Sequence, residues 1–149
     1  WIYSRIKKFP FGPFGDMVAP GAIVGQAIGR LGCTANGCCY GTPTNVPWAF
    51  IYTNPNTLAP LGVATHPTVV YELLFDLSLF GMLYKLRGRL APAGSLFVVY
   101  VATYSVGRFF LTFLREGDVF AGGLLQAQIV SLVVIAAALP FLLIKTRRV

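Results

Sequence analysis

The sequence predicts an all-α membrane protein, a bundle of about four transmembrane helices with a long ordered extracytoplasmic loop. The 149 residues are 56% hydrophobic and only 11% charged, with a mean hydropathy of +0.68. A soluble domain carries roughly 25% charged residues. Apolar runs recur along the chain, which has room for about four spans at ~20 residues each. We expect residues 1–149 to form a single membrane-embedded domain.

The basic residues indicate topology rather than nucleic-acid binding. Net charge is +7, but nine of the 12 lysines and arginines fall in three clusters that flank apolar runs. All three clusters share one side if there are four spans, and the positive-inside rule places that side in the cytoplasm. No nucleic-acid partner is therefore expected. The clusters are Arg5/Lys7/Lys8, Lys85/Arg87/Arg89 and Lys145/Arg147/Arg148.

The amino-terminal part predicts one span after a turn. Residues 1–15 indicate the end of a helix, a basic patch and a turn, with Trp1 at the membrane interface. Asp16 is placed to cap the next helix, the span at residues 17–36. Glycines recur there every three or four residues, so we expect a flat face that takes a neighbouring helix closely. The predicted helix breakers are Pro10, Gly12, Pro13 and Gly15, and the flat face is Gly21, Gly25, Gly29 and Gly32.

A loop without charged residues follows at residues 37–68. Loops of this length are usually functional or disordered, and the aromatic residues near Trp48 indicate an ordered loop at the interface. Glu72 and Asp76 lie four residues apart and so share a face of the second span. A polar connection around Glu116 separates the last two spans. The predicted second, third and fourth spans are residues 69–86, 93–114 and 123–144.

The polar residues inside the spans share one depth. Arg30 lies roughly 20 Å and Arg108 roughly 22 Å from the cytoplasmic end at 1.5 Å per residue. Glu72 and His66 fall at the same outer level. An intramembrane arginine is costly and marks a functional site by default. Two guanidinium groups at headgroup depth suit the phosphate of an anionic phospholipid, and would stabilise negative charge on a departing phosphate.

Structural alternatives remain for each of these residues. Arg30 and Glu72 can form a buried structural ion pair, or Arg30 can snorkel to the interface. Glu72 can act as a base or hold an arginine in place. His66, the only histidine, can cap a helix or act in catalysis. Asp76 lies deeper and is expected to pair rather than to react.

The cysteines allow several interpretations. Cys33, Cys38 and Cys39 lack the CxxC spacing of zinc or thioredoxin-type sites, and a single histidine is a poor fourth ligand. No metal is therefore predicted. Three thiols on an outer face can form one disulfide and leave one free. Packing of small residues at a helix end is the interpretation that we favour.

Three segments in order resemble the signature of the bacterial prolipoprotein diacylglyceryl transferases. They are GRLGC followed by NGCCYG at residues 29–41, HPT followed by YE at residues 66–72, and GRFF followed by FLRE at residues 107–116. The resemblance extends from Asp16 to Ser131. Each motif alone is weak, but their order and spacing match together.

The resemblance implies an activity in lipoprotein maturation. The family moves the diacylglyceryl group of phosphatidylglycerol to the lipobox cysteine thiol in a prolipoprotein signal peptide, and releases glycerol phosphate. The implied partners are phosphatidylglycerol, the prolipoprotein and membrane lipids, and no metal or cofactor is implied. The implied location is the bacterial cytoplasmic (inner) membrane, crossed several times, with the active site toward the extracytoplasmic face.

The resemblance also implies residue roles. Arg30 and Arg108 correspond to the essential arginines, so the catalytic candidates are these two with Glu72 and His66. The expected substrate-binding residues are Asn36, Gly41, Tyr71, Tyr104 and Gln128.

The chain departs from the family pattern in places. Many members carry Asn at the position of Cys33, Glu at that of Cys38, and Glu where Thr112 stands. The family has a His-Gly-Gly motif on a helix before the basic patch, and residues 1–3 resemble the end of that helix. We therefore expect this chain to be the later part of a larger seven-helix architecture.

Two other functions compete with lipid transfer. One is a catalytically inactive lipid-binding or assembly homologue on the same scaffold, which the missing histidine motif favours. The other is a membrane thiol oxidoreductase built on the three cysteines.

Overall fold

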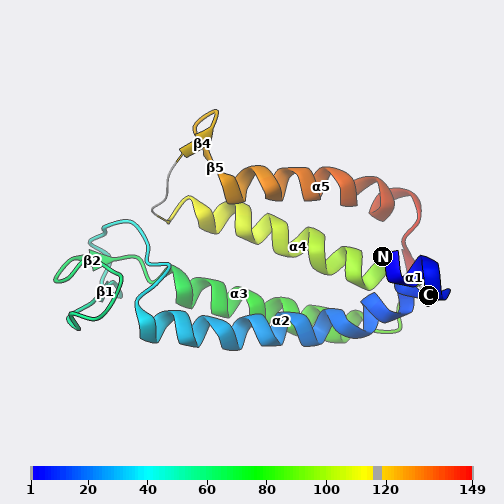
Figure 1. The fold of residues 1–149 in the computed structure, drawn as a ribbon, viewed down its shortest axis with the longest axis horizontal. Coiled ribbons are helices and arrows are strands. Elements are labelled where there is room, and N and C mark those ends of the chain that lie inside the picture. The colour runs from blue at the N-terminus through cyan, green and yellow to red at the C-terminus, as the bar shows by residue number, and fades with distance from the viewer. Residues whose placement is uncertain (1, 116–118, 149) are drawn as a thin grey trace.

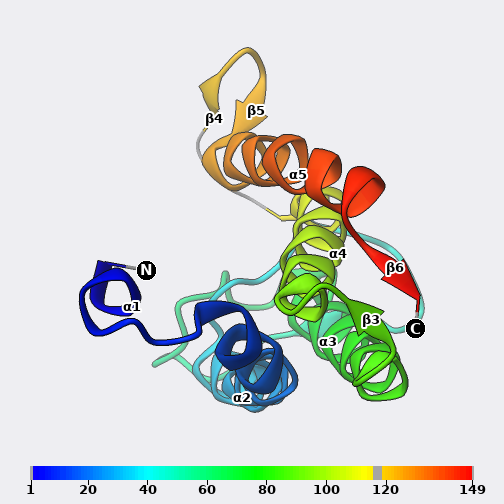
Figure 2. The same cartoon turned by 90° about the vertical axis from the view of Figure 1, so that its right-hand side faces the viewer.

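Four long helices lie side by side in the computed structural model, which describes residues 2–115 and 119–148 (Figure 1). Helices α2, α3 and α4 pack on one another, and α5 packs on α4 (Figure 2). A short α1 (Ile2–Lys7) precedes them. The predictions for Trp1 and Glu116 lie outside the described residues. The long helices are α2 (Phe11–Asn36), α3 (Thr68–Leu86), α4 (Ser95–Thr112) and α5 (Gln126–Ile144).

The last three helices lie within three residues of their predicted bounds. The segments that carry the three basic clusters are at one end of the bundle, together with both termini (Figure 1). At this end, β3 (Leu90–Ala91) pairs with β6 (Arg147–Arg148) in an antiparallel manner. The segments that carry the basic clusters therefore lie together at one end of the bundle, and their side of the membrane stays a prediction.

The start of the first long helix was predicted wrongly. Helix α2 begins at Phe11, directly after Pro10, and the other three residues expected to break it lie inside it. Pro13 is tolerated because its missing N–H falls in the first turn, where no helical hydrogen bond is needed. Gly12 and Gly15 allow α4 to approach closely. An added Cβ at Gly12 would lie 2.7 Å from the Ala93 carbonyl oxygen, and one at Gly15 would lie 3.2 Å from Phe97 Cβ.

Asp16 caps a different helix from the one that was expected. It lies inside α2, and its carboxylate accepts the N–H groups of Gly94 at 2.7 Å and Phe97 at 2.9 Å. These donors belong to the first turn of α4, which has no intrahelical partner for them. The carboxylate also complements the positive end of the α4 dipole. Asp16 therefore fixes α2 against the start of α4.

The predicted glycine face does not take a neighbouring helix in the described structure. An added Cβ at any of its four glycines would meet nothing within 4 Å; they are Gly21, Gly25, Gly29 and Gly32. Helix α2 instead buries Ala19, Ile23 and Ala27. Ile23 packs with Leu79, Leu83 and others in the core. Larger apolar side chains gain more from burial than glycines do, so they determine which face is covered.

Loops and short strands occupy the opposite end of the bundle (Figure 1). Residues 37–67 connect α2 to α3, and within them β1 (Phe50–Ile51) pairs with β2 (Ala64–Thr65). The α4–α5 connection contains the pair β4 (Val119–Ala121) and β5 (Leu124–Leu125). The predicted loop thus has strand pairing of its own.

Two described helices, α4 and α5, are long and apolar enough to cross a membrane. The buried face of helix α5 includes the polar residues Gln128 and Ser131. Its exposed face carries large apolar side chains, among them Val133, Leu139 and Leu143. That distribution suits a lipid-facing helix, because lipid is the apolar solvent there. Helix α3 carries three charged residues, Glu72, Asp76 and Lys85. By length and composition, two of the four predicted spans are therefore identified among the described residues.

Candidate functional site

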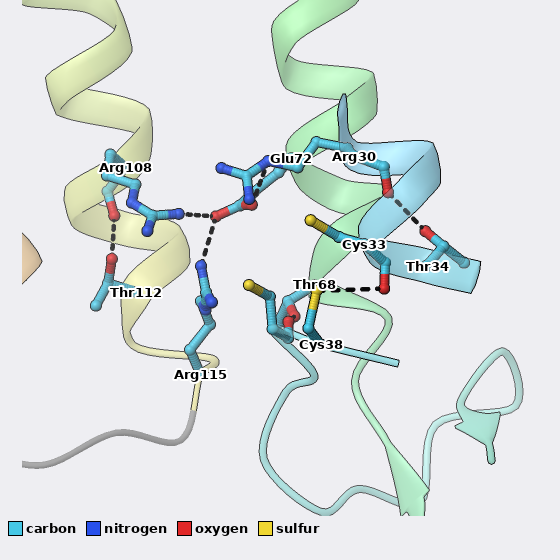
Figure 3. Close-up of polar contacts among 10 residues, drawn as sticks. Arg30, Cys33, Thr34, Cys38, Thr68, Glu72, Arg108, Thr112 and Arg115 are labelled. Atoms are coloured by element: carbon cyan, nitrogen blue, oxygen red, sulfur yellow. Dashed lines mark hydrogen bonds and ion pairs between the residues drawn. The ribbon is translucent and has the colours of Figure 1, made fainter. Parts of the chain in front are cut away.

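Three arginines converge on the carboxylate of Glu72 (Figure 3). Arg30 Nε lies 2.9 Å from Oε2. Arg108 Nη1 donates to Oε1, and Arg115 Nη1 donates to the same oxygen at 3.4 Å. The Glu72 side chain is only 4% exposed, so these ion pairs are shielded from water and from salt.

Each charged side chain comes from a different part of the bundle. Arg30 lies near the end of α2, Glu72 in the second turn of α3, and Arg108 in the last third of α4. Arg115 lies beyond α4, where the chain continues in tight turns. The N–H groups of residues 113, 114 and 115 bond to carbonyls three residues earlier, so Arg115 stays on the face of Arg108.

A glycine sets the distance between α3 and α4 at this level. An added Cβ at Gly107 would lie 2.2 Å from the Phe75 ring. Phe75 is three residues after Glu72 and so projects from a similar face of α3. The absence of a side chain at Gly107 lets the ring lie against α4. This close approach allows Arg108 to reach Glu72.

The cluster carries excess positive charge. Three guanidinium groups share one carboxylate, which leaves two positive charges uncompensated within the ion pairs. Asp76 lies one turn further along α3 and is buried, and its Oδ2 has no hydrogen-bond partner among the described residues. An excess of at least one charge remains when Asp76 is counted as an anion. An excess at a shielded position favours an anionic ligand.

A cavity adjoins this charge. It has a volume of about 430 Å³, and Tyr104, Arg108 and Gln126 line it. Val101 and Val134 also line it, and they are shared with a second, apolar hollow of about 340 Å³ between α4 and α5. We refer to the two adjoining hollows together as the groove, which is lined by Arg108 at one end and by Phe97 and Phe141 at the other.

His66 and Tyr71 form a separate group at the entry to α3. His66 Nδ1 lies 3.5 Å from the Tyr71 hydroxyl. That hydroxyl accepts a hydrogen bond of 2.7 Å from the Trp48 indole N–H. Neither residue contacts the arginines through a hydrogen bond or an ion pair in the part of the chain that the structure describes.

Gly41 joins three segments of the chain. Its N–H donates to the His66 carbonyl at 3.2 Å, and it forms a β-bridge with Arg115. An added Cβ would lie 2.6 Å from the His66 oxygen and 2.8 Å from the Leu114 oxygen. The next residue, Thr42, donates to the Leu114 carbonyl at 2.9 Å and accepts from His66 at 3.0 Å. Only glycine fits here.

Two further expected residues lie apart from the cluster. Asn36 is exposed at the end of α2, where its carbonyl accepts the Leu58 N–H at 3.4 Å. Gln128 is buried at the start of α5, and its Oε1 accepts the Leu125 N–H at 2.9 Å. Gln128 Nε2 has no partner among the described residues. Gln128 thus caps α5 in this structure.

The three cysteines meet at the end of α2, Cys33 in its last turn and Cys38 and Cys39 just after it. All are free thiols, so the alternative of a disulfide is not realised in this structure. Their sulfur atoms lie within 4.8 Å of one another. Cys38 Sγ donates weakly to the Cys33 carbonyl at 3.7 Å (Figure 3). Burial raises the pKa of the Cys38 thiol, and neighbouring Cys33 and Cys39 add to that shift.

The structure brings together Arg30, Glu72 and Arg108, three of the residues that the sequence places at a common depth. Arg115 was missed as a member of this cluster, although it stands in the FLRE motif. The signal was its position seven residues after Arg108, which is about two helical turns. The side-chain cluster does not include His66, Tyr71, Asn36 or Gln128.

Comparison with known proteins identifies relatives. A model of the family described as prolipoprotein diacylglyceryl transferase matches residues 1–144. One relative named phosphatidylglycerol--prolipoprotein diacylglyceryl transferase, from Dehalococcoides mccartyi, is 45% identical over 99% of this chain and 57% of its own length. Another of that name, from Trichormus variabilis, is 41% identical over 88% of this chain and 49% of its own length. One from Clostridioides difficile is 37% identical over 89% of this chain and 50% of its own length. The chain thus spans about half the length of these relatives.

Proposed function

Because the chain belongs to the prolipoprotein diacylglyceryl transferase family, we propose that it transfers a diacylglyceryl group from phosphatidylglycerol to the lipobox cysteine of prolipoproteins. The curated relatives carry that activity in their names. Membrane embedding follows from the family and from the apolar helices α4 and α5. The arrangement of charge and cavity described above supports this lipid substrate.

The observation that carries the proposal is the uncompensated charge at the head of an apolar groove. A phospholipid has a phosphate at one end and acyl chains at the other. Arg108 lines the polar end of the groove, and Phe97 and Phe141 line the apolar end. A guanidinium group binds phosphate oxygens through a planar fork. The headgroup would therefore lie at the arginines, with an acyl chain between α4 and α5.

The chemistry of transfer matches a cationic site. The acceptor sulfur attacks the glyceryl carbon that bears the phosphate ester. A C–S bond forms, the C–O bond breaks, and glycerol phosphate leaves with the electron pair. Negative charge therefore builds up on the phosphate, where Arg30 and Arg108 stabilise it. Pre-oriented donors of this kind are worth about 10²–10³-fold in rate each.

Glu72 acts in this proposal as a positioning residue. Both of its carboxylate oxygens are engaged by arginine side chains. It restrains the guanidinium groups and leaves an excess of charge for the substrate. The thiol proton passes to His66, the only histidine of the chain.

The remaining residues form the substrate-binding site in this proposal, either by contacting the lipid or by holding the segments around it. Tyr104 and Gln126 contact the lipid in the cavity beside Arg108. Gly41, Tyr71, Asn36 and Gln128 hold the loop and helix ends around it. The four long helices cross the cytoplasmic membrane, with the basic end in the cytoplasm by the positive-inside rule. Residues 37–67 and the arginine cluster then face the extracytoplasmic side.

A reconstituted assay tests the proposal. Full-length protein is placed in phosphatidylglycerol vesicles with a lipobox peptide, and mass spectrometry follows the gain of one diacylglyceryl group. We expect transfer to the cysteine peptide, none to a matched serine peptide, and none in vesicles of phosphatidylcholine. Arg30→Ala and Arg108→Ala should each abolish transfer while the protein remains inserted.

Two outcomes would contradict the proposal. Lipid binding without any transfer would support the inactive homologue instead. Unchanged transfer in either arginine variant would remove the phosphate site from the mechanism. Gly25→Ala serves as the matched control, since its added Cβ would meet nothing within 4 Å.

A further inference from the structure

The three cysteines form a cluster of donors that the lipid site does not use. They are all the cysteines of the chain, and each is half-buried. Their sulfur atoms lie within 4.8 Å of one another.

The end of α2 explains how two of the thiols meet. Gly37 adopts a left-handed conformation with φ of 64°. The Cys38 N–H then donates to the Cys33 carbonyl at 3.2 Å, and the Gly37 N–H to the Thr34 carbonyl at 3.3 Å. This pair of bonds is a Schellman motif, which places the side chains equivalent to Cys33 and Cys38 in contact.

A second conformational feature brings in the third thiol. Cys39 has φ of 64°, in a region that residues with a Cβ seldom adopt. Its carbonyl is held by the Thr68 hydroxyl at 2.9 Å. Packing at a helix end needs only the Cys33–Cys38 contact. The strained residue that completes the trio points to a ligand for all three sulfurs.

The dimensions and charge of the cluster fit a thiophilic metal ion. Thiolates select Zn²⁺ among the common divalent cations. With Zn–S bonds of about 2.3 Å, tetrahedral sulfurs lie about 3.8 Å apart, so shifts of about 1 Å suffice. Zn²⁺ with three thiolates has a net charge of −1. The arginine cluster is one turn away, since Arg30 precedes Cys33 by three residues and Thr68 precedes Glu72 by four.

We propose that Cys33, Cys38 and Cys39 bind Zn²⁺ through three thiolates, with the fourth tetrahedral position open to an exogenous ligand. Three Zn–S bonds form, and three thiol protons pass to water. Among the described residues, the cluster contains no fourth cysteine, histidine or carboxylate. Zinc sites with three protein ligands and an open position are those that act on a substrate.

The open position suits a thiol, an assignment that rests on the proposed function. The acceptor cysteine brings a thiol to within about a turn of the arginines that would bind the phosphate. A coordinating thiol is deprotonated outright, and the thiolate is the nucleophilic form. A fourth Zn–S bond forms in this state, and the proton of the acceptor thiol passes to His66, the base of the proposed transfer.

Cobalt substitution tests the site without relying on lipid turnover. The purified full-length protein is reduced with a phosphine and titrated with Co²⁺ in detergent. We expect sulfur-to-cobalt charge-transfer bands, intense d–d bands of a four-coordinate ion, and displacement of both by one equivalent of Zn²⁺. Cys33→Ser, Cys38→Ser and Cys39→Ser should each weaken Zn²⁺ binding at least tenfold. Thr34→Ser, on the same turn, should bind normally.

Several results would overturn the inference. Absent charge-transfer bands, or a serine variant that binds like the parent while its helical circular dichroism is unchanged, would remove the three-thiolate site. For the fourth position, a lipobox cysteine peptide should strengthen the charge-transfer band of the Co²⁺ protein, and a serine peptide should not. No change with the cysteine peptide refutes the thiol assignment. Because these readouts are optical, they stay separate from failure of lipid transfer.

Discussion

Two carboxylates cross between helices at opposite ends of α4, and their partners differ. At the start of α4, Asp16 of α2 accepts two backbone N–H groups. Near the other end, Glu72 of α3 meets three guanidinium groups (Figure 3). Both carboxylates join neighbouring helices. Asp16 complements the positive end of the α4 dipole, whereas at the negative end it is the arginines, not Glu72, that complement it.

The difference lies in what remains after pairing. The neutral donors around Asp16 are satisfied, so that contact has no unused binding capacity. The arginines around Glu72 outnumber their anionic partner, so that contact is incomplete without a further anion. A buried ion pair by itself is weak evidence for function. An unbalanced cluster beside a cavity is stronger evidence, and the following variants test this distinction.

The largest effect is expected at Glu72. Glu72→Ala leaves three arginines facing one another and should cost about 3–5 kcal/mol of stability. Lipid transfer should fall by about 10³-fold, because the guanidinium groups lose their common anchor. Glu72→Gln keeps the shape and removes the charge. Thermal unfolding and the transfer rate check both, and near-normal transfer by Glu72→Gln would mean that its charge does not position the arginines.

His66 tests whether the group at the entry to α3 takes part in chemistry. If His66 accepts the thiol proton, His66→Gln should lower kcat by about 10²-fold or more and leave KM for the lipid unchanged. A small effect on kcat would assign His66 to the Gly41 junction alone.

Gly107 tests the spacing that lets Arg108 reach Glu72. Gly107→Ala forces the Phe75 ring to move, because the new Cβ would lie 2.2 Å from it. We expect about a tenfold loss of transfer, and partial recovery in the double variant with Phe75→Leu. Gly25→Ala is the matched control in an open part of α2. Equal behaviour of both alanine variants would rule out the spacing role.

Asp16 should give the smallest effect on activity. Asp16→Ala removes two hydrogen bonds at a helix start and should cost about 1–2 kcal/mol. Asp16→Asn keeps one oxygen acceptor and should cost less. The transfer rate per folded molecule should match the parent in both. A rate loss comparable with that of Glu72→Ala would abolish the contrast between the two carboxylates.

Much of the fold was predictable because the apolar runs are long. Helices α3, α4 and α5 begin and end close to those runs, and the depth of Arg30, Glu72 and Arg108 followed from counting residues along them. The start of α2 was not predictable from local rules. Gly12, Gly15 and Asp16 contact residues 93–97, at and just before the start of α4. These residues lie some 80 positions further along the chain.

The parts of the site that escaped prediction depend on backbone turns. Arg115 reaches Glu72 because the chain continues in tight turns after α4, whereas the sequence indicated a polar connection there. The cysteine cluster depends on left-handed conformations at Gly37 and Cys39. Spacing rules for metal motifs do not include such turns, so the spacing of the cysteines did not indicate that the three sulfurs lie together.

The Gly41 junction gives the site a mechanical coupling. Backbone hydrogen bonds tie residues 41 and 42 to His66 on one side and to Leu114, next to Arg115, on the other. The loop therefore cannot swing outward without displacing the third arginine. Opening of the 37–67 segment and loss of the charge cluster become one cooperative event. The amides of Gly41, Thr42 and His66 should then exchange with solvent deuterium at a common rate, slowed together when an anionic lipid binds.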